Sequence, residues 1–185
     1  TAGTLDVSGS NYGITAKSWT DTGSGAFTEG TGTVTFDGTG TLNSNEAFNN
    51  VTINGSGMTI TLGAALDVDG TLTLTAGTLD TSGSNYGITL AGNWTNNGGT
   101  FTSQSNTVTF DGSGDQTLTT GGTGASQDFN NLTVNKAAGT LSLATNALDV
   151  DSTLTITSGT MSPGSLNITA AALTVRLAAL AAELL

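Results

Sequence analysis

This chain repeats itself over long stretches. The segment AGTLDVSGSNYGIT at residues 2–15 returns as AGTLDTSGSNYGIT at residues 76–89, which is 74 positions later. A second pair, LDVDGTLTLTAGTL from Leu66 and LDVDSTLTITSGTM from Leu148, is offset by 82 positions. The chain therefore holds two long repeats and the start of a third. Because similar stacked units bury their core against one another, this repetition predicts a repeat architecture.

A shorter period of about twenty residues runs inside each long repeat. Apolar positions recur along one series: Ile14, Val34, Val51, Leu72, Ile88, Val108, Leu132 and Leu154. Around them, apolar residues alternate with Thr or Ser, and GSG, DGTG and NNGG turn signals bound the short runs. We expect an all-β fold, a right-handed parallel β-helix (β-solenoid) with about 20 residues per coil. A β-sandwich or barrel is the alternative, but the DG and NG dipeptides do not separate mirrored strands as hairpin turns would.

The composition excludes several classes of function. Only 9% of residues are charged and the net charge is −11, so no basic stripe is present to bind nucleic acid or an anionic membrane surface. Low charge suits a solenoid, because like charges stacked one coil apart repel. The chain has no His and no Cys, which removes the usual general base and the thiol nucleophile. We expect no enzyme activity, no catalytic residues and no cofactor.

Acidic residues are the remaining candidates for chemistry. Pairs two residues apart would point to one side of a strand and could offer oxygen ligands to Ca²⁺: Asp67 with Asp69, and Asp149 with Asp151. Another group could supply the two carboxylates of a glycoside hydrolase: Asp37, Asp111 and Asp115. We interpret both groups as turn or solvated carboxylates, because they recur at repeated positions.

Uncharged surface residues suggest a second kind of function. Thr-x-Thr runs could form a flat array that binds ice or carbohydrate: Thr59–Thr61, Thr71–Thr73–Thr75 and Thr153–Thr155–Thr157. Trp19 and Trp94 occupy equivalent positions, and so do Tyr12 and Tyr86. Exposed aromatic rings could stack on sugars, but we expect these rings to be buried and to close a wide coil. A binding module for carbohydrate or ice is therefore the alternative function.

The composition changes at Ala170, where AAALTVRLAALAAELL begins. Ala, Leu, Arg and Glu favour helices, so we expect residues 1–169 to form the solenoid and residues 170–185 a helical cap or docking tail. The run is shorter than the roughly 20 residues of a membrane span and carries two charges, so we expect no membrane-spanning segment. Because Thr1 falls inside a repeat, we interpret the chain as a processed or partial piece of a longer one.

Several segments resemble the repeats of very large bacterial surface proteins: FNNLTVN with GTLSL, LDVDSTLTITSGT and TVTFDGSGDQTL. These β-strand-repeat proteins are similar in solenoid architecture to filamentous haemagglutinin-type adhesins. The resemblance covers about residues 1–169 and offers no catalytic residues to transfer. It implies an extracellular or cell-surface rod that serves adhesion, matrix or filament building. We therefore expect a structural or adhesive element whose partners are further copies, end to end, or a host or matrix surface.

Overall fold

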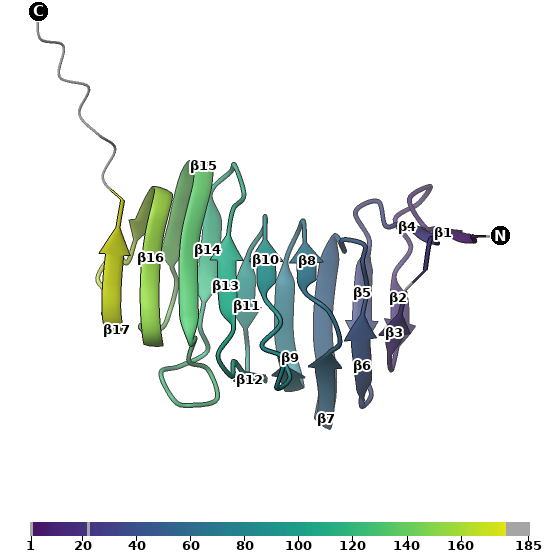
Figure 1. The fold of residues 1–185 in the computed structure, drawn as a ribbon, viewed down its shortest axis with the longest axis horizontal. Coiled ribbons are helices and arrows are strands. Elements are labelled where there is room, and N and C mark those ends of the chain that lie inside the picture. The colour runs from purple at the N-terminus through teal and green to yellow at the C-terminus, as the bar shows by residue number, and fades with distance from the viewer. Residues whose placement is uncertain (1, 22, 177–185) are drawn as a thin grey trace, which may run out of the picture.

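The chain forms a β-solenoid in which parallel strands stack along one axis (Figure 1). The computed structural model describes residues 2–21 and 23–176. It contains about eight turns of roughly 21 residues each, which confirms the predicted fold class. Across the described ranges every element is a strand, and none is a helix that could cross a membrane.

Seventeen strands make up the described coils. They are β1 (Thr4–Asp6), β2 (Ile14–Ala16), β3 (Trp19–Thr20), β4 (Ala26–Thr28), β5 (Thr33–Phe36), β6 (Gly40–Asn43), β7 (Asn50–Leu62), β8 (Leu66–Val68), β9 (Leu72–Asp80), β10 (Ile88–Leu90), β11 (Trp94–Asn96), β12 (Thr100–Thr102), β13 (Thr107–Phe110), β14 (Gln116–Thr119), β15 (Asn131–Leu143), β16 (Leu148–Ser162) and β17 (Ile168–Val175). The longest, β7, β9, β15 and β16, each contribute to more than one side of a coil.

The strands pair in three parallel ladders, one for each side of the coil. The first ladder joins residues 66–68, 88–90, 107–110, 131–134, 154–156 and 173–175. The second ladder joins residues 14–16, 33–36, 50–53, 72–74, 94–96, 116–119, 140–143 and 160–162. The third ladder joins residues 19–20, 40–43, 60–62, 78–80 and 100–102, and near the C-terminal end it joins residues 148–150 and 168–170. Each residue thus stacks on its neighbour one coil away, at the spacing of about 4.8 Å between paired strands.

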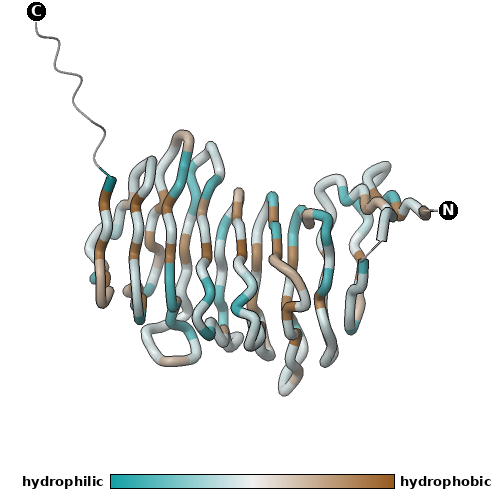
Figure 2. Tube along the Cα trace, viewed as in Figure 1, coloured by the Kyte–Doolittle hydropathy of each residue, from teal (hydrophilic) through white to brown (hydrophobic). Residues whose placement is uncertain are grey.

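The core is a column of apolar side chains inside the coils. In β5 and β13 the apolar residues of TVTF are buried and the Thr residues are half-buried, as period-two alternation requires. Hydrophobic positions line up from one coil to the next along the rod (Figure 2). Leu, Ile, Val and Phe ladders fill this column, so each coil buries its apolar face against its neighbours.

The long sequence repeat is not a whole number of coils. Ile14 belongs to the second ladder, whereas Ile88, its equivalent 74 residues later, belongs to the first. Leu72 accordingly pairs with Trp94 and not with Ile88. Equivalent residues of the two copies therefore lie on different sides of the rod.

The helix expected over residues 170–185 is wrong for its described part. Ala170 lies in β17, which runs to Val175 and pairs with β16. Ala and Leu favour helices only weakly, and the unpaired edge of β16 offers a full set of backbone hydrogen bonds, so tertiary pairing overrides propensity. The solenoid thus extends past residue 169, and residues 177–185 lie outside the described part of the chain.

Candidate functional surfaces

Threonines form two continuous files on the outside of the rod. Six in-register threonines lie on the second ladder: Thr15, Thr35, Thr52, Thr73, Thr95 and Thr119. Five lie on the first ladder: Thr89, Thr109, Thr133, Thr155 and Thr174. The predicted Thr-x-Thr runs do not share one array, because Thr73 and Thr155 belong to different ladders. The regular feature runs across the strands, one threonine per coil.

The two tryptophans belong to two matching aromatic clusters. Trp19, Phe27 and Phe48 have ring centroids 4.8, 5.2 and 5.7 Å apart. Trp94, Phe101 and Phe129 repeat this cluster with centroids 4.8, 5.0 and 5.5 Å apart. Edge-to-face and tilted contacts at these distances are favourable. Trp94 is buried and Trp19 half-buried, so the prediction that these rings close the coil is confirmed.

The indole nitrogens do not distinguish a ligand site. Nε1 of both Trp19 and Trp94 is buried without a hydrogen-bond partner among the described residues. Trp94 has this property in the middle of the rod, where its ring is only 1% exposed. The unpaired N–H therefore belongs to the aromatic cluster itself. Tyr12, in contrast, is 65% exposed near the N-terminal end, so the expectation that its ring is buried is wrong, whereas Tyr86 packs against the core.

The acidic residues considered as Ca²⁺ ligands point outward from the coil. Asp67 lies between buried Leu66 and Val68, and burial together with Asp69 and Asp111 raises the pKa of its carboxyl. Within residues 2–21 and 23–176, no group of three or more acidic side chains could hold a metal ion. The Ca²⁺ interpretation therefore gains no support from the geometry.

Of the residues considered for glycoside hydrolysis, Asp115 connects its turn to the next coil. Asp115 Oδ1 accepts a hydrogen bond of 2.9 Å from the backbone N–H of Thr140 on the next coil. Asp111 and Asp37 end the equivalent TVTFD segments of the two copies, one on the first ladder and one on the second. The geometry does not place Asp37 opposite Asp111 as a catalytic pair.

Asp128 is an unpaired carboxylate that the sequence did not indicate. It is 8% exposed, and its Oδ1 has no hydrogen-bond partner among the described residues. Phe129 bridges Val150, which places Asp128 beside Asp149 one coil away. Burial, then Asp149 and Asp151, raise the pKa of the Asp128 carboxyl. The equivalent position in the first copy is Ala47, so this electrostatic cost is confined to the second copy.

We expect Asp128→Ala, which copies Ala47, to stabilise the protein at pH 7 by about 1 kcal/mol, because it removes a buried, unpaired carboxylate. The folded pKa lies above the unfolded value of 3.8, so the folded state takes up this proton first as pH falls. The native protein should thus gain stability relative to the variant between the raised pKa and 3.8. Urea unfolding at pH 7 and pH 4 measures both effects, with exposed Asp37→Ala as control. A less stable variant at pH 7 would contradict the assignment.

Lys136 is a buried lysine inside the second copy. Its side chain is 1% exposed, and Nζ donates hydrogen bonds to Gly112 O at 2.7 Å and Gly114 O at 2.9 Å, and a third to Gln116 Oε1. Gln116 in turn donates through Nε2 to Leu90 O at 3.0 Å. Three carbonyl oxygens thus satisfy the three N–H donors of the ammonium group. In the first copy Gly55 stands at this position of β7.

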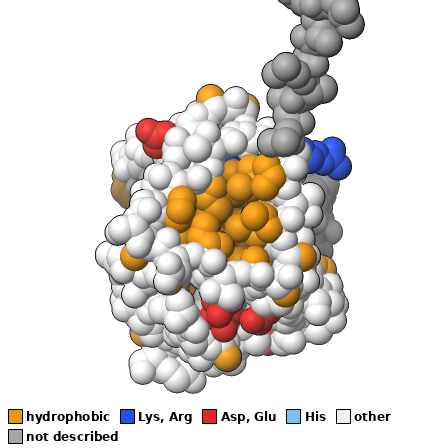
Figure 3. Space-filling model, turned by 90° about the vertical axis from the view of Figure 1, so that its left-hand side faces the viewer, with side chains coloured by type: hydrophobic (Ala, Val, Ile, Leu, Met, Phe, Trp, Pro, Cys, Tyr) orange, Lys and Arg blue, Asp and Glu red, His pale blue; other side chains and the backbone are white. Residues whose placement is uncertain are grey.

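The C-terminal end of the rod exposes apolar core residues. Figure 3 looks onto this end, where hydrophobic side chains gather in one patch. A hollow of about 270 Å³ is lined by Leu154, Ile156, Met161, Ile168, Ala170 and Leu173. Leu173 is 63% exposed, so this last coil leaves apolar surface uncovered. Open ends of this kind are where another strand can pair.

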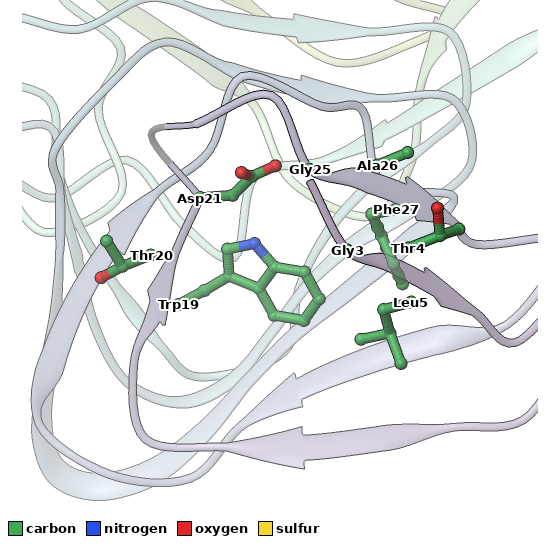
Figure 4. A pocket seen from close by; sticks show the side chains of 9 residues that line it. All are labelled: Gly3, Thr4, Leu5, Trp19, Thr20, Asp21, Gly25, Ala26 and Phe27. Carbon is green, nitrogen blue, oxygen red and sulfur yellow. The ribbon is translucent and has the colours of Figure 1, made fainter. Parts of the chain in front are cut away.

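The N-terminal end is hollow as well. A cavity of about 360 Å³ contains the indole of Trp19, with Leu5 and Phe27 across from it and Asp21 nearby (Figure 4). Leu5 is 48% exposed, whereas its equivalent Leu79 in the middle of the rod is fully buried. The cavity is therefore the place where a preceding coil would lie.

Comparisons with family models, with curated proteins and with solved structures find no match to this chain.

Proposed function

We propose that this chain is a structural or adhesive rod that works outside the cell as a subunit or segment of a cell-surface adhesin or filament. The single observation that carries the proposal is a continuous parallel ladder with an open apolar coil at both ends. Strand edges at the two ends run in the same direction, so the end of one copy matches the start of another. Such a head-to-tail contact does not close and extends a filament.

The sides of the rod support the same proposal. Outward positions are mostly Thr, Ser and Asn, and the net charge of −11 keeps isolated rods soluble. The many backbone hydrogen bonds between coils make a stiff, extended scaffold. Adhesion to a host or matrix surface would use these uncharged sides, and assembly would use the ends.

We expect negative-stain electron microscopy over a concentration series to show unbranched fibres that lengthen with concentration. Leu173→Glu places a charge on the exposed C-terminal end and should change the protein concentration at which fibres form, without unfolding the rod. Met58→Glu is the matched control, because Met58 is also exposed, at 41%, but lies in the bend of β7 on the side of the rod. Its fibres should resemble those of the native chain.

Discrete short rods at every concentration would contradict the assembly role. The file of six threonines on the second ladder would then favour the alternative, a binding module for ice or carbohydrate. Thermal hysteresis and glycan binding would be the next measurements in that case.

A further inference from the structure

The last described coil repeats the first one in sequence and in position. Ile168-Thr169-Ala170 has the same letters as Ile14-Thr15-Ala16, and Leu173-Thr174 follows at the spacing of Trp19-Thr20. Within the rod, the equivalent pair Ile88 and Trp94 stacks on Leu66 and Leu72. At the C-terminal end, Ile168 and Leu173 stack on Leu148 and Leu154 in the same way. Strand β17 therefore fills a position that the N-terminal strands β2 and β3 also match.

Strand β17 fills that position poorly. Leu173 stands where the other copies have tryptophan, and it is 63% exposed, whereas Trp19, which also lies in an end coil, is half-buried. Val175 is 46% exposed, and the three residues from Ala170 to Ala172 bury little apolar area. The hollow beside Leu154 and Met161 remains open as a result. Release of β17 costs few buried contacts, as expected of an element at the low end of local stability.

The N-terminal coil has the complementary deficiency. Trp19 lies in the open cavity because its strand, β3, pairs only with β6 and has no partner on its outer edge in the described rod. In the middle of the rod, Leu72 and Leu74 cover the equivalent Trp94 and Asn96. The third-copy equivalents of Leu72 and Leu74 are Leu154 and Ile156, which lie in β16 under β17. A second copy thus supplies the strand that Trp19 lacks.

We infer that two copies join by strand exchange, in which β2 and β3 of one copy replace β17 on β16 of the next. This rests on the proposed assembly function and specifies its joint. Phe27 of the incoming copy then lies over Met161, as Phe101 lies over Leu79 within the chain. Strand β1 becomes redundant and is released; it pairs only with β4, in a separate two-stranded sheet. The joint uses the strand register that already occurs between the sequence repeats within one chain. Each added chain leaves a new open end for the next one.

Cysteine pairs test the exchange directly, because the chain has no cysteine of its own. In the exchanged joint Thr155 faces Thr20 of the next copy, as Thr73 faces Thr95 within the chain. The expected Cα separation of about 4.8 Å lies within disulfide reach. Within one copy, Thr155 pairs with Thr174, and Thr20 pairs with Asn43 at the other end of the rod. A disulfide in Thr155→Cys with Thr20→Cys can therefore form only between copies.

We expect this double variant to give a ladder of reducible multimers on a denaturing gel after mild oxidation. The matched control is Thr174→Cys with Thr20→Cys, which reports direct stacking of intact end coils and should give far fewer multimers. Multimers confined to the control, or fibres in the microscope with neither disulfide, would overturn the exchange and leave assembly standing. Monomers in both variants and no fibres would overturn the exchange together with the proposed function.

The chain without β17 provides a second measurement. A variant that ends at Asn167 leaves β16 uncovered and removes the competing strand. Under strand exchange it should form fibres at a lower protein concentration than the full chain. A higher concentration requirement would show that β17 is part of the joint and would overturn the exchange.

Discussion

Phe129→Ala is expected to destabilise the rod by about 3–5 kcal/mol, the usual cost of removing a buried phenylalanine ring. Phe129 is fully buried, and its ring lies 5.0 Å from Trp94 and 5.5 Å from Phe101. The cavity forms in the middle of the rod, where coils on both sides hold the backbone in place and limit collapse. Chemical denaturation followed by tryptophan fluorescence measures the effect.

The first copy offers a matched comparison. Phe48→Ala removes the equivalent ring, which is also fully buried, from the cluster around Trp19. That cluster borders the open N-terminal cavity, so its neighbours can relax into the space and the cost should be smaller. Tyr12→Ala, at a 65% exposed position, should have almost no effect. An equal loss at Phe48 and Phe129 would show that the N-terminal end is packed as tightly as the interior.

The stacking of the coils could be predicted from the sequence, but the side of the rod on which each strand lies could not. The recurrence of Ile14, Val34, Val51 and Leu72 corresponds to pairs in the second ladder. Ile88 continues that series by spacing alone, yet the structure places it in the first ladder. The step of sixteen residues from Leu72 to Ile88 is compatible with one short coil, or with a path along only two of the three sides of a coil. Only the position of Trp94 on Leu72 decides between them.

The C-terminal segment shows a second limit. Ala170, Ala171 and Ala172 favour a helix by composition, and the local sequence carries no turn signal. The match of Ile168-Thr169-Ala170 to Ile14-Thr15-Ala16 was the signal for a further coil, because it continues the third repeat. The alignment of the repeats is therefore a better guide than helix propensity where an unpaired strand edge is available.

Lys136 could not have been singled out from the sequence as a buried residue. The segment from Phe110 to Leu118 is two residues longer than its equivalent from Phe36 to Leu42, and this longer loop carries the carbonyls that Lys136 binds. An isolated lysine in a chain of low charge indicates a solvated side chain. The difference between Gly55 and Lys136 can be explained only from the structure, which places the loop of the neighbouring coil against Lys136.

Lys136→Met is expected to destabilise the protein by about 3 kcal/mol, because it leaves buried acceptors of the loop without their donor. Methionine fills a similar volume, so the loss reports the hydrogen bonds to Gly112, Gly114 and Gln116 and not a cavity. Lys17→Met makes the same change of charge at an exposed position and should cost less than 1 kcal/mol. Urea unfolding at pH 7 compares the two variants.

The pH dependence separates a hydrogen-bonded ammonium group from simple packing. Burial lowers the pKa of Lys136, and Asp115 and Asp111 oppose that shift. The folded state then loses this proton before the unfolded state does, so this group's contribution to stability rises with pH between the lowered pKa and 10.5. Lys136→Met should lack that rise, whereas Lys17→Met should keep it. If both variants follow the native curve and cost little, the three carbonyls find other donors, and the buried lysine does not hold the loop.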